Sequence, residues 1–292
     1  MIWQPQITAD GSFTFFSQEF QENFHSYDGA KGEALNKFVE PCLLADLANF
    51  SSSIYLLDIC YGLGYNSAAA LETIWRVNPK CQIKLMALEL NSKVPEQAIA
   101  HKLMADWSEP IPQLLTELVA NYQIKTENLE AQLLIGDARQ TIKQVIKAKF
   151  KADGIFLDPF SPPKCPQLWT VDFMKLVTQC LKQEGIIATY SCAASVRAAL
   201  LEVGLNIGTS KIWGRRSPGT VASFPHNQLP PLSQKAVEHL QTRAAIPYRD
   251  PNLEDTADII IQRKHTEQQT SSLEPSSHWK KRWMGESTLQ ET

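Results

Sequence analysis

The chain has 292 residues, of which 43% are hydrophobic, and its formal net charge is −3. This length and composition predict a globular protein with one sizeable core, and they exclude a chain that coats nucleic acid by charge alone. No basic stretch followed by an apolar core opens the sequence, and no apolar run approaches the roughly 18 residues of a membrane span. We therefore expect a cytoplasmic protein that does not enter the membrane.

The six cysteines give no sign of a metal site. They are scattered along the chain, without a CxxC pair and without a histidine-rich partner motif. Reduced thiols packed in apolar segments are therefore expected, and no bound metal.

The first fifty residues predict an extension that precedes the main sheet. Gly11–Phe16 predicts a small hairpin, and His25–Ala30 predicts a loop. Glu33 then opens an amphipathic helix that runs toward Leu47. Such an extension either caps the core or folds over a ligand.

From residue 51 to residue 225, apolar strands alternate with amphipathic helices. The predicted strands are 54–59, 82–88, 131–135, 154–157 and 185–190, and the predicted helices are 66–77, 90–105, 111–122, 138–149, 171–182 and 193–203. This alternation predicts a Rossmann-like, doubly wound sheet that is mostly parallel. Short strands over 209–213 and 220–224 would close one edge as an antiparallel hairpin.

The last part of the chain has a different character. After residue 225 come a proline-rich linker and helical patterns over 233–243 and 254–264, and the tail from about residue 284 is expected to be disordered. The sequence thus divides into an extension (1–50), a Rossmann-like domain (51–225) and a C-terminal helical region (226–292).

Acidic residues terminate four of the predicted strands: Asp58, Glu89, Asp137 and Asp158. Because ligands of a doubly wound sheet bind outside the carboxyl ends of its strands, these side chains should converge. Clustered carboxylates repel one another unless a cationic or hydroxyl-rich group lies between them. The four strand ends therefore predict a binding site for such a ligand.

The turn after the first main strand narrows the choice of ligand. Gly62 and Gly64 allow close approach of the backbone, and Asn66 opens a helix with unpaired N–H groups. A dinucleotide would need a third glycine, and its diphosphate would meet the carboxylate of Asp58. S-adenosylmethionine carries an ammonium, a sulfonium and a ribose diol instead, and these groups suit carboxylates. The turn therefore favours S-adenosylmethionine over a dinucleotide.

The segment Asp158–Pro162 places a carboxylate and a rigid turn at a strand end, followed by an aromatic ring. A carboxylate beside an amine can hold it, accept its proton and orient its lone pair. The ring of Phe160 could stack on a flat substrate. The simpler alternatives are that Asp158 only caps a turn and that Phe160 belongs to the core.

Several segments together resemble the MnmC-like methyltransferases: Asp58–Asn66, Gly136–Ala138, Asp158–Pro162, Pro166–Thr170, and Ser26–Ala30 with Glu33. The resemblance covers roughly residues 8 to 224. It implies a class I S-adenosylmethionine-dependent methyltransferase that methylates the 5-aminomethyl group of the tRNA wobble uridine, giving 5-methylaminomethyl uridine. No GxGxxG follows Pro225, so a stand-alone methyltransferase is expected, without a flavin-dependent oxidase domain.

The resemblance also implies roles for individual residues. The cofactor would be bound by Glu33, Asp58, Gly62, Gly64, Asn66, Glu89, Asp137 and Ala138. Within this set, Glu89 would bind the ribose and Asp137 the adenine. Asp158 would face the amine as the catalytic residue. The amine would come from upstream wobble-uridine modification enzymes, either through a separate oxidase or directly by an ammonium route.

The expected macromolecular partner is the anticodon region of tRNA. Phe160, Lys164, Arg215 and Arg216 are the candidate substrate contacts, and Lys211–Arg216 and His278–Trp283 both mix basic and aromatic residues. A solvated edge and a solvated tail are the alternatives for these two segments. Two other functions stay open, namely a methyl- or aminopropyltransferase for small amines and a non-catalytic RNA-binding module of the same fold.

Overall fold

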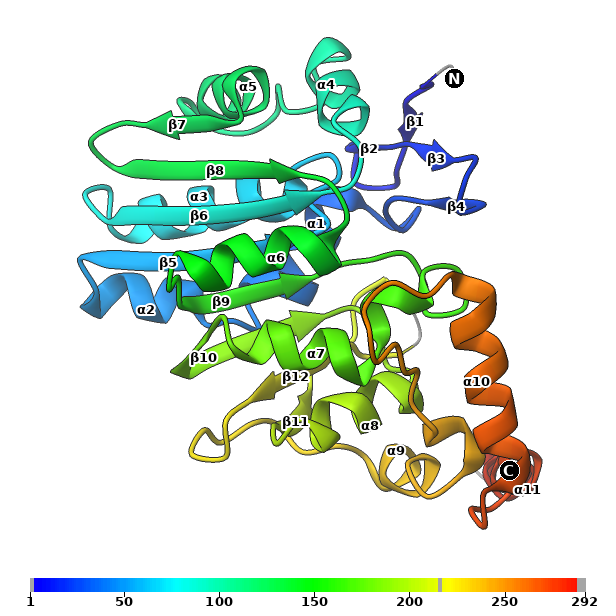
Figure 1. Ribbon diagram of the computed structural model, residues 1–292. Coiled ribbons are helices and arrows are strands. Elements are labelled where there is room, and N and C mark those ends of the chain that lie inside the picture. The colour runs from blue at the N-terminus through cyan, green and yellow to red at the C-terminus, as the bar shows by residue number, and fades with distance from the viewer. Residues whose placement is uncertain (1–2, 215–216, 288–292) are drawn as a thin grey trace.

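The computed structural model describes residues 3–214 and 217–287. Its centre is an eight-stranded sheet in which five adjacent strands are parallel and the strand pairs at both edges are antiparallel (Figure 1). The strands lie in the order β11 (Asn206–Thr209), β12 (Thr220–Ser223), β10 (Leu181–Thr189), β9 (Ala152–Leu157), β5 (Ser53–Ile59), β6 (Gln82–Glu89), β8 (Leu129–Ile135) and β7 (Gln123–Lys125). The predicted doubly wound, mostly parallel sheet is confirmed.

The central strands are buried on both faces. On β5, Ile54 and Leu56 belong to one hydrophobic core, and Leu57 and Ile59 belong to the other, because successive side chains of a strand point to opposite faces. The first core is covered by α1 (Ala30–Ala34), a π-helical turn (Leu35–Val39), α2 (Leu44–Phe50), α3 (Tyr65–Val77), α4 (Lys93–Ala100) and α5 (Ile111–Asn121). The second is covered by α6 (Ala138–Lys147), α7 (Val171–Thr178) and α8 (Ala194–Glu202).

The N-terminal segment differs from the prediction. It forms two short ribbons, β1 (Gln6–Ile7) with β2 (Phe13–Thr14) and β3 (Phe16–Ser17) with β4 (Glu22–Asn23). The single helix expected from Glu33 to Leu47 is wrong, because the chain turns between the π-helical turn and α2. Pro41 lies in this turn, where it has no N–H to donate, and Leu43 adopts a left-handed conformation with φ of 54°.

The predicted edge hairpin also needs correction. Its first strand ends at Thr209 rather than extending to Trp213, and β7 has no counterpart in the prediction. Residues 210–214 form a loop instead. The side chain of Trp213 packs so closely on Gly32 that a Cβ atom there would lie 2.1 Å from the ring.

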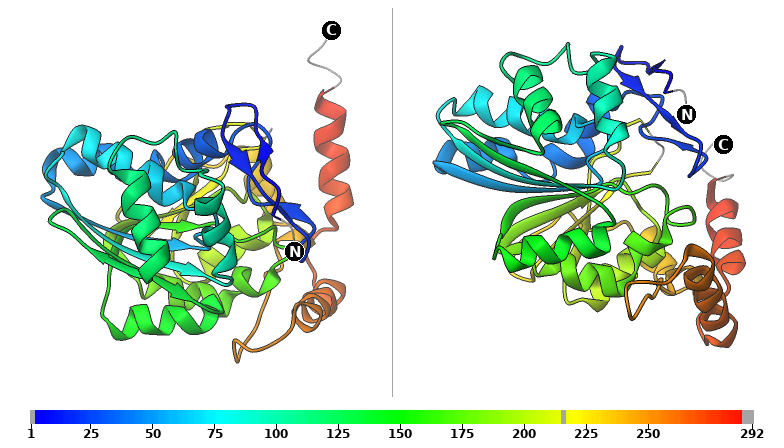
Figure 2. Two further views of the ribbon diagram at one scale, coloured as in Figure 1. Left: turned by 90° about the horizontal axis from the view of Figure 1, so that it is seen from above. Right: turned by 45° about the horizontal axis from the view of Figure 1, so that its top comes forward.

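The C-terminal region contains α9 (Gln234–His239), a short 3₁₀ turn (Arg243–Ala245), α10 (Ala257–Thr270) and α11 (Ser276–Ser287), and another 3₁₀ turn (Pro166–Trp169) precedes α7. Disorder from residue 284 is therefore wrong as far as Ser287, and residues 288–292 lie outside the described part. Figure 2 shows α11 projecting from the body. In Figure 1, the N-terminal ribbons and α10 both lie on the side toward which the parallel strands point.

Among residues 3–214 and 217–287, no helix combines the length and the apolar character needed to cross a lipid bilayer.

Candidate functional site

Four acidic side chains lie at or just beyond the carboxyl ends of adjacent parallel strands. In the order of the sheet they are Asp158 after β9, Asp58 on β5, Glu89 on β6 and Asp137 after β8. The chain proceeds from β5 to one edge through β6 and β8, and then returns to β9 on the other side of β5. The acidic strand ends therefore converge at the topological switch point, where doubly wound sheets bind their ligands.

The glycine turn is tied to the end of β6. The backbone N–H of Gly62 donates to Oε2 of Glu89 at 2.8 Å. Gly62 and Gly64 have φ of 56° and 91°, and Cys60, which is not a glycine, also adopts a left-handed φ of 70°. A Cβ atom on Gly64 would lie 2.6 Å from the hydroxyl oxygen of Tyr61. Glycine is thus required at this position for both conformation and space.

Asp58 lies beneath this turn and is completely buried, with 0% exposure. Its Oδ2 accepts a hydrogen bond of 2.6 Å from the Ser67 hydroxyl, whereas its Oδ1 has no partner within the described residues. Burial raises the pKa of Asp58 to about 7; the Glu89 charge adds to this rise and the Ser67 hydrogen bond opposes it. An unpaired buried carboxylate oxygen is costly unless a ligand satisfies it.

Glu89 is also buried, with both carboxylate oxygens in use. Its Oε1 accepts from the backbone N–H of Asn91 at 2.9 Å, and its Oε2 accepts from Gly62. Burial raises its pKa, although hydrogen bonds from the Asn91, Gly62 and Leu90 backbones oppose the rise. The Glu89 carboxylate therefore holds the backbone at Gly62 and at Asn91, and both residues line the pocket described below.

Asp137 begins α6 and accepts a hydrogen bond from the Arg139 backbone N–H at 2.9 Å. The guanidinium of Arg139 also binds this carboxylate, with 2.7 Å between Nη2 and Oδ2. Neither Asp137 nor Ala138 lines the pocket described below. Arg139 was missed by the sequence analysis, although its position two residues after a helix-capping aspartate was a usable signal.

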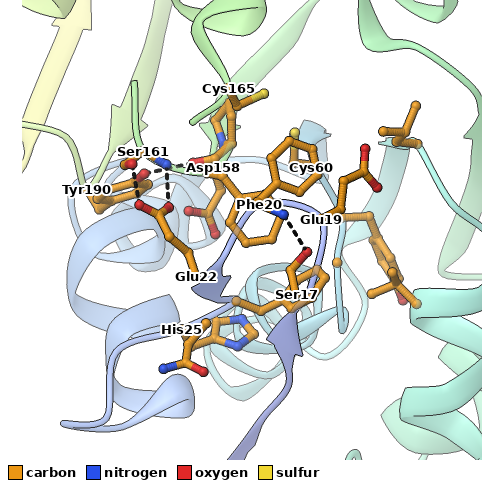
Figure 3. A pocket seen from close by; sticks show the side chains of 18 of the residues that line it. Ser17, Glu19, Phe20, Glu22, His25, Cys60, Asp158, Ser161, Cys165 and Tyr190 are labelled. Carbon is orange, nitrogen blue, oxygen red and sulfur yellow. Dashed lines mark hydrogen bonds between the residues drawn. The ribbon is translucent and has the colours of Figure 1, made fainter. Parts of the chain in front are cut away.

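A pocket of about 520 Å³ opens at this edge of the sheet (Figure 3). Its volume lies within the roughly 300–1,000 Å³ range of small-molecule sites. Of the predicted site residues it brings together Glu33, Gly62, Glu89, Asp158 and Phe160. The others lie outside its wall within the described residues: Asp58, Gly64, Asn66, Asp137, Ala138 and Lys164. Arg215 and Arg216 lie outside the part of the chain that the structure describes.

The loop that follows β9 is held from several directions. Asn66 lies behind the pocket wall, where its Nδ2 donates to Oδ2 of Asp158 at 2.9 Å. The Tyr190 hydroxyl donates to the Pro159 carbonyl at 2.8 Å, and Nε1 of Trp169 donates to the Phe160 carbonyl at 2.8 Å. These bonds fix both the Asp158 carboxylate and the backbone of the two residues that follow it.

The N-terminal ribbon β3–β4 forms a large part of the opposite wall. Phe20 stacks on Phe160 with ring centroids 4.4 Å apart, and Phe24 meets the same ring edge-on at 5.0 Å. Glu22 accepts hydrogen bonds from the backbone N–H and the hydroxyl of Ser161, as Figure 3 shows. The extension therefore folds over the site, and one face of Phe160 is already covered.

The pocket is strongly acidic. Its wall carries six carboxyl side chains, namely Glu19, Glu22, Asp28, Glu33, Glu89 and Asp158, and no lysine or arginine among the residues described. Burial lowers the pKa of His25 to about 4, against a smaller opposing effect of the Asp10 charge, so this histidine is neutral near pH 7. Such a wall favours cationic ligands and disfavours phosphates.

The described parts of segments 211–216 and 278–283, which mix basic and aromatic residues, are only partly available for RNA. Trp279 stacks on His239 at 4.0 Å, and Nε1 of Trp283 donates to Glu238 at 3.0 Å, so both rings serve to pack α11 on α9. Lys164 and Lys211 are exposed near the loops that carry Asp158 and Trp213.

Comparison with known proteins gives three matches that bear on this site. A family model described as S-adenosyl-L-methionine-dependent methyltransferase matches residues 94–225. An uncharacterized protein of Methanocaldococcus jannaschii is 30% identical over 266 residues, which are 87% of this chain and 69% of that protein. The crystal structure of MnmC2 from Aquifex aeolicus superposes with a TM-score of 0.81 and 34% identity, covering 92% of this chain and 86% of that one.

Longer relatives match as well. The tRNA 5-methylaminomethyl-2-thiouridine biosynthesis bifunctional protein MnmC of Ralstonia nicotianae is 27% identical over 235 residues, or 76% of this chain. This chain spans about a third of the length of such bifunctional proteins, since the match covers 34% of that relative.

The site residues fit S-adenosyl-L-methionine. The buried oxygens Oδ1 of Asp58 and Oδ1 of Asn66 have no partner in the described chain, and both lie at the glycine turn. Gly62 lines the pocket wall in a left-handed conformation, and the carboxylates suit an ammonium, a sulfonium and a ribose diol.

Proposed function

Because this chain belongs to the MnmC-like family of S-adenosyl-L-methionine-dependent methyltransferases, we propose that it methylates the amine of a 5-aminomethyl uridine at the tRNA wobble position. The substrate is suggested by the names of the longer relatives, which refer to 5-methylaminomethyl-2-thiouridine in tRNA. The observation that carries the proposal is the Asp158 carboxylate, which Asn66 fixes at the wall of a pocket with five further carboxyl side chains.

In this proposal Asp158 binds and deprotonates the substrate amine. An aminomethyl group is an ammonium near neutral pH, and the acidic wall attracts it. Asp158 accepts one ammonium proton, which frees the nitrogen lone pair to form the new N–C bond. When bound, S-adenosyl-L-methionine supplies the methyl group on a sulfonium sulfur. The hydrogen bond from Asn66 holds the carboxylate in one orientation, so the amine is positioned as well as deprotonated.

The cofactor-binding residues are part of the same proposal. Asp58, the glycine turn and Asn66 lie around the methionine portion, Glu89 binds the ribose hydroxyls, and Asp137 with Ala138 adjoins the adenine. Glu33 supports the covering loop, because its Oε2 accepts a hydrogen bond of 2.7 Å from the Ser26 N–H. Residues 51–225 would then carry the transferase fold, and residues 1–50 and 226–292 would be additions to it.

The anticodon arm would approach the rim of the pocket. Lys164 is exposed in the loop after Asp158, and Lys211, Arg215 and Arg216 belong to the segment that follows β11. Contacts of these side chains with phosphates would make binding salt-dependent. The amine itself must be supplied by a reaction that leaves a 5-aminomethyl group on the uridine, and we assign that reaction to separate upstream enzymes.

Methyl transfer from labelled S-adenosyl-L-methionine tests the proposal. The acceptors are tRNA that carries 5-aminomethyl uridine, the same tRNA without the aminomethyl group, and free polyamines. We expect label only in the first. Label in the polyamines would instead identify an enzyme for small amines, and no label in any acceptor, despite cofactor binding, would point to a non-catalytic role.

A further inference from the structure

A buried carboxylate in the C-terminal region reaches the start of α6. Asp250 has 0% exposure, and its Oδ2 accepts a hydrogen bond of 2.8 Å from Nη1 of Arg139. Its Oδ1 accepts from the backbone N–H groups of Glu254 and Asp255 at 3.1 Å each. Its own N–H donates to Asp172 at 2.8 Å. Asp250 is therefore held by three hydrogen bonds in addition to the one from Arg139.

Arg139 bridges this carboxylate and the one at the end of β8. Its Nε and Nη2 bind Oδ2 of Asp137 at 3.0 and 2.7 Å, while its Nη1 binds Asp250 and the Asp255 carbonyl at 2.8 and 2.9 Å. A guanidinium is planar and rigid, so fixing Nη1 also fixes the direction of the Nε–Nη2 edge. The position of the Asp137 carboxylate thus depends on a residue 113 positions later in the chain.

This bridge lies beside the pocket. The Cys165 side chain lines the pocket wall and belongs to the same hydrophobic core as Ala138, the residue between Asp137 and Arg139. The segment around Asp250 is itself joined to the fold, because Tyr248 pairs with Thr170 and its carbonyl accepts from Val171 at 3.0 Å. The C-terminal region is therefore joined to the fold next to the residues that carry this bridge.

We propose that Asp250 is a positioning residue of the cofactor site, which acts through Arg139 to hold Asp137 where it accepts a hydrogen bond from the adenine amino group. The inference rests on the proposed assignment of Asp137 to the adenine. An ionised carboxylate is only an acceptor, so it pairs with an amino group and repels a carbonyl oxygen in the same place. Asp250 therefore contributes to the selection of a 6-amino purine over a 6-oxo purine.

Calorimetric dissociation constants for two ligands test this role. The ligands are S-adenosylhomocysteine and its deaminated analogue S-inosylhomocysteine, which has a 6-oxo group. We expect the wild-type protein to prefer the adenosyl ligand by about 10-fold or more, since a hydrogen bond to a charged group contributes about 1.5–3 kcal/mol. The Asp250→Asn variant should lose most of this preference, chiefly by binding S-adenosylhomocysteine more weakly.

A neighbouring residue provides the matched control. Arg249 joins the same segment to α8 by two bonds to Glu202, at 2.7 and 2.9 Å, and among the described residues its side chain makes no hydrogen bond or ion pair with Arg139. Arg249→Gln should loosen the C-terminal region to a similar degree and keep the preference for the adenosyl ligand. Loss of preference in both variants would show that Asp250 serves only to attach the region, and would overturn the proposal.

A second variant decides the matter if Asp250→Asn does not fold. Arg139→Lys keeps the charge but loses the fork that binds two carboxylates, so it should lose the preference too. If folded Asp250→Asn or Arg139→Lys retained the preference, the proposed role of Asp250 would be overturned, and the assignment of Asp137 would stand. No preference in the wild-type protein would also overturn the assignment of Asp137. Neither ligand requires tRNA, so an error in the proposed substrate does not affect the result.

Discussion

The pocket is built by two regions of the molecule that hold their side chains in different ways. The acidic residues of the first region stand at the ends of parallel strands, and β5 and β6 are each bonded to a neighbour on both sides along most of their length. The sheet itself therefore places the end of each strand. A change of side chain there leaves the strand itself in place and removes chiefly the acidic group.

The two terminal segments hold their residues by a few side-chain contacts instead. The ribbon β3–β4 meets the loop after β9 through Phe20 on Phe160 and Glu22 on Ser161. The C-terminal region meets α6 through Asp250, the Asp255 carbonyl and the Leu253 carbonyl. These contacts join each segment to the part of the body that carries the site. Strand-end substitutions should therefore abolish function, whereas terminal substitutions should misplace groups that are still present.

Asp158→Asn should have the largest effect. Asparagine keeps the size of the side chain but cannot accept the proton of the amine, so we expect turnover to fall by roughly 100-fold or more. Cofactor affinity, measured by calorimetry, should stay close to that of the wild type. Asp153→Asn is the control, because Asp153 lies near the opposite end of β9 and pairs with Lys182 at 2.7 Å. Equal turnover in wild type and Asp158→Asn would remove Asp158 from the mechanism.

Glu89→Gln should weaken cofactor binding by about 10- to 100-fold, since the charged acceptor of the Gly62 and Asn91 N–H groups is lost. Isothermal calorimetry with S-adenosylhomocysteine measures this change. Glu130→Gln on the neighbouring strand is the control, because Glu130 is half-exposed and its lysine partners are 3.8 Å away. An affinity equal to that of the wild type would contradict the ribose assignment of Glu89.

Glu22→Ala tests the contact between the N-terminal ribbon and the loop that follows β9. Without this carboxylate the Ser161 amide loses its acceptor, so the loop that carries Asp158 should become more mobile. We expect turnover to fall by about 10-fold, a smaller loss than for Asp158→Asn and within the range for misplaced catalytic groups. Hydrogen exchange at Ser161 should accelerate, and Glu22→Gln should restore part of both properties. Unchanged exchange would show that other contacts hold the loop.

The smallest expected effect concerns Asp58, whose protonation is linked to folding and to ligand binding. Its pKa is about 7 in the fold and 3.8 as the ordinary value, so the folded state holds the proton more tightly. Without ligand, its contribution makes the free energy of unfolding fall as pH rises from about 4 to about 7. A cation bound beside it lowers this pKa, and near pH 7 binding should release about half a proton.

Calorimetry in buffers of different ionisation enthalpy measures that release. Asp58→Asn, which cannot titrate, should abolish it and should flatten the dependence of thermal unfolding on pH. Cofactor binding without proton release in the wild-type protein would place the cationic group away from Asp58.

The sequence was sufficient to predict what depends on local pattern. Apolar runs alternating with amphipathic helices predicted the parallel strands, and the acidic residues were visible because each lies within two residues of the end of such a run. The glycine turn was visible because only glycine suits its conformation and space. These features need no knowledge of distant residues.

The missed features depend on contacts between distant positions. Glu22 and Ser161 are separated by 139 residues, and Asp250 and Arg139 by 111, so no periodicity links them. The interrupted helix before Leu47 shows a similar limit, because the apolar pattern continued across Pro41 and the π-helical turn that precedes it. Tertiary contacts thus decided which terminal residues enter the site.

Mass spectrometry of wobble nucleosides tests the central claim most directly. tRNA would be prepared from cells that contain the protein, cells that lack it, and cells that contain only the Asp158→Asn variant. We predict 5-methylaminomethyl uridine in the first preparation and its unmethylated 5-aminomethyl precursor in the other two. Identical nucleosides in all three preparations would contradict the account.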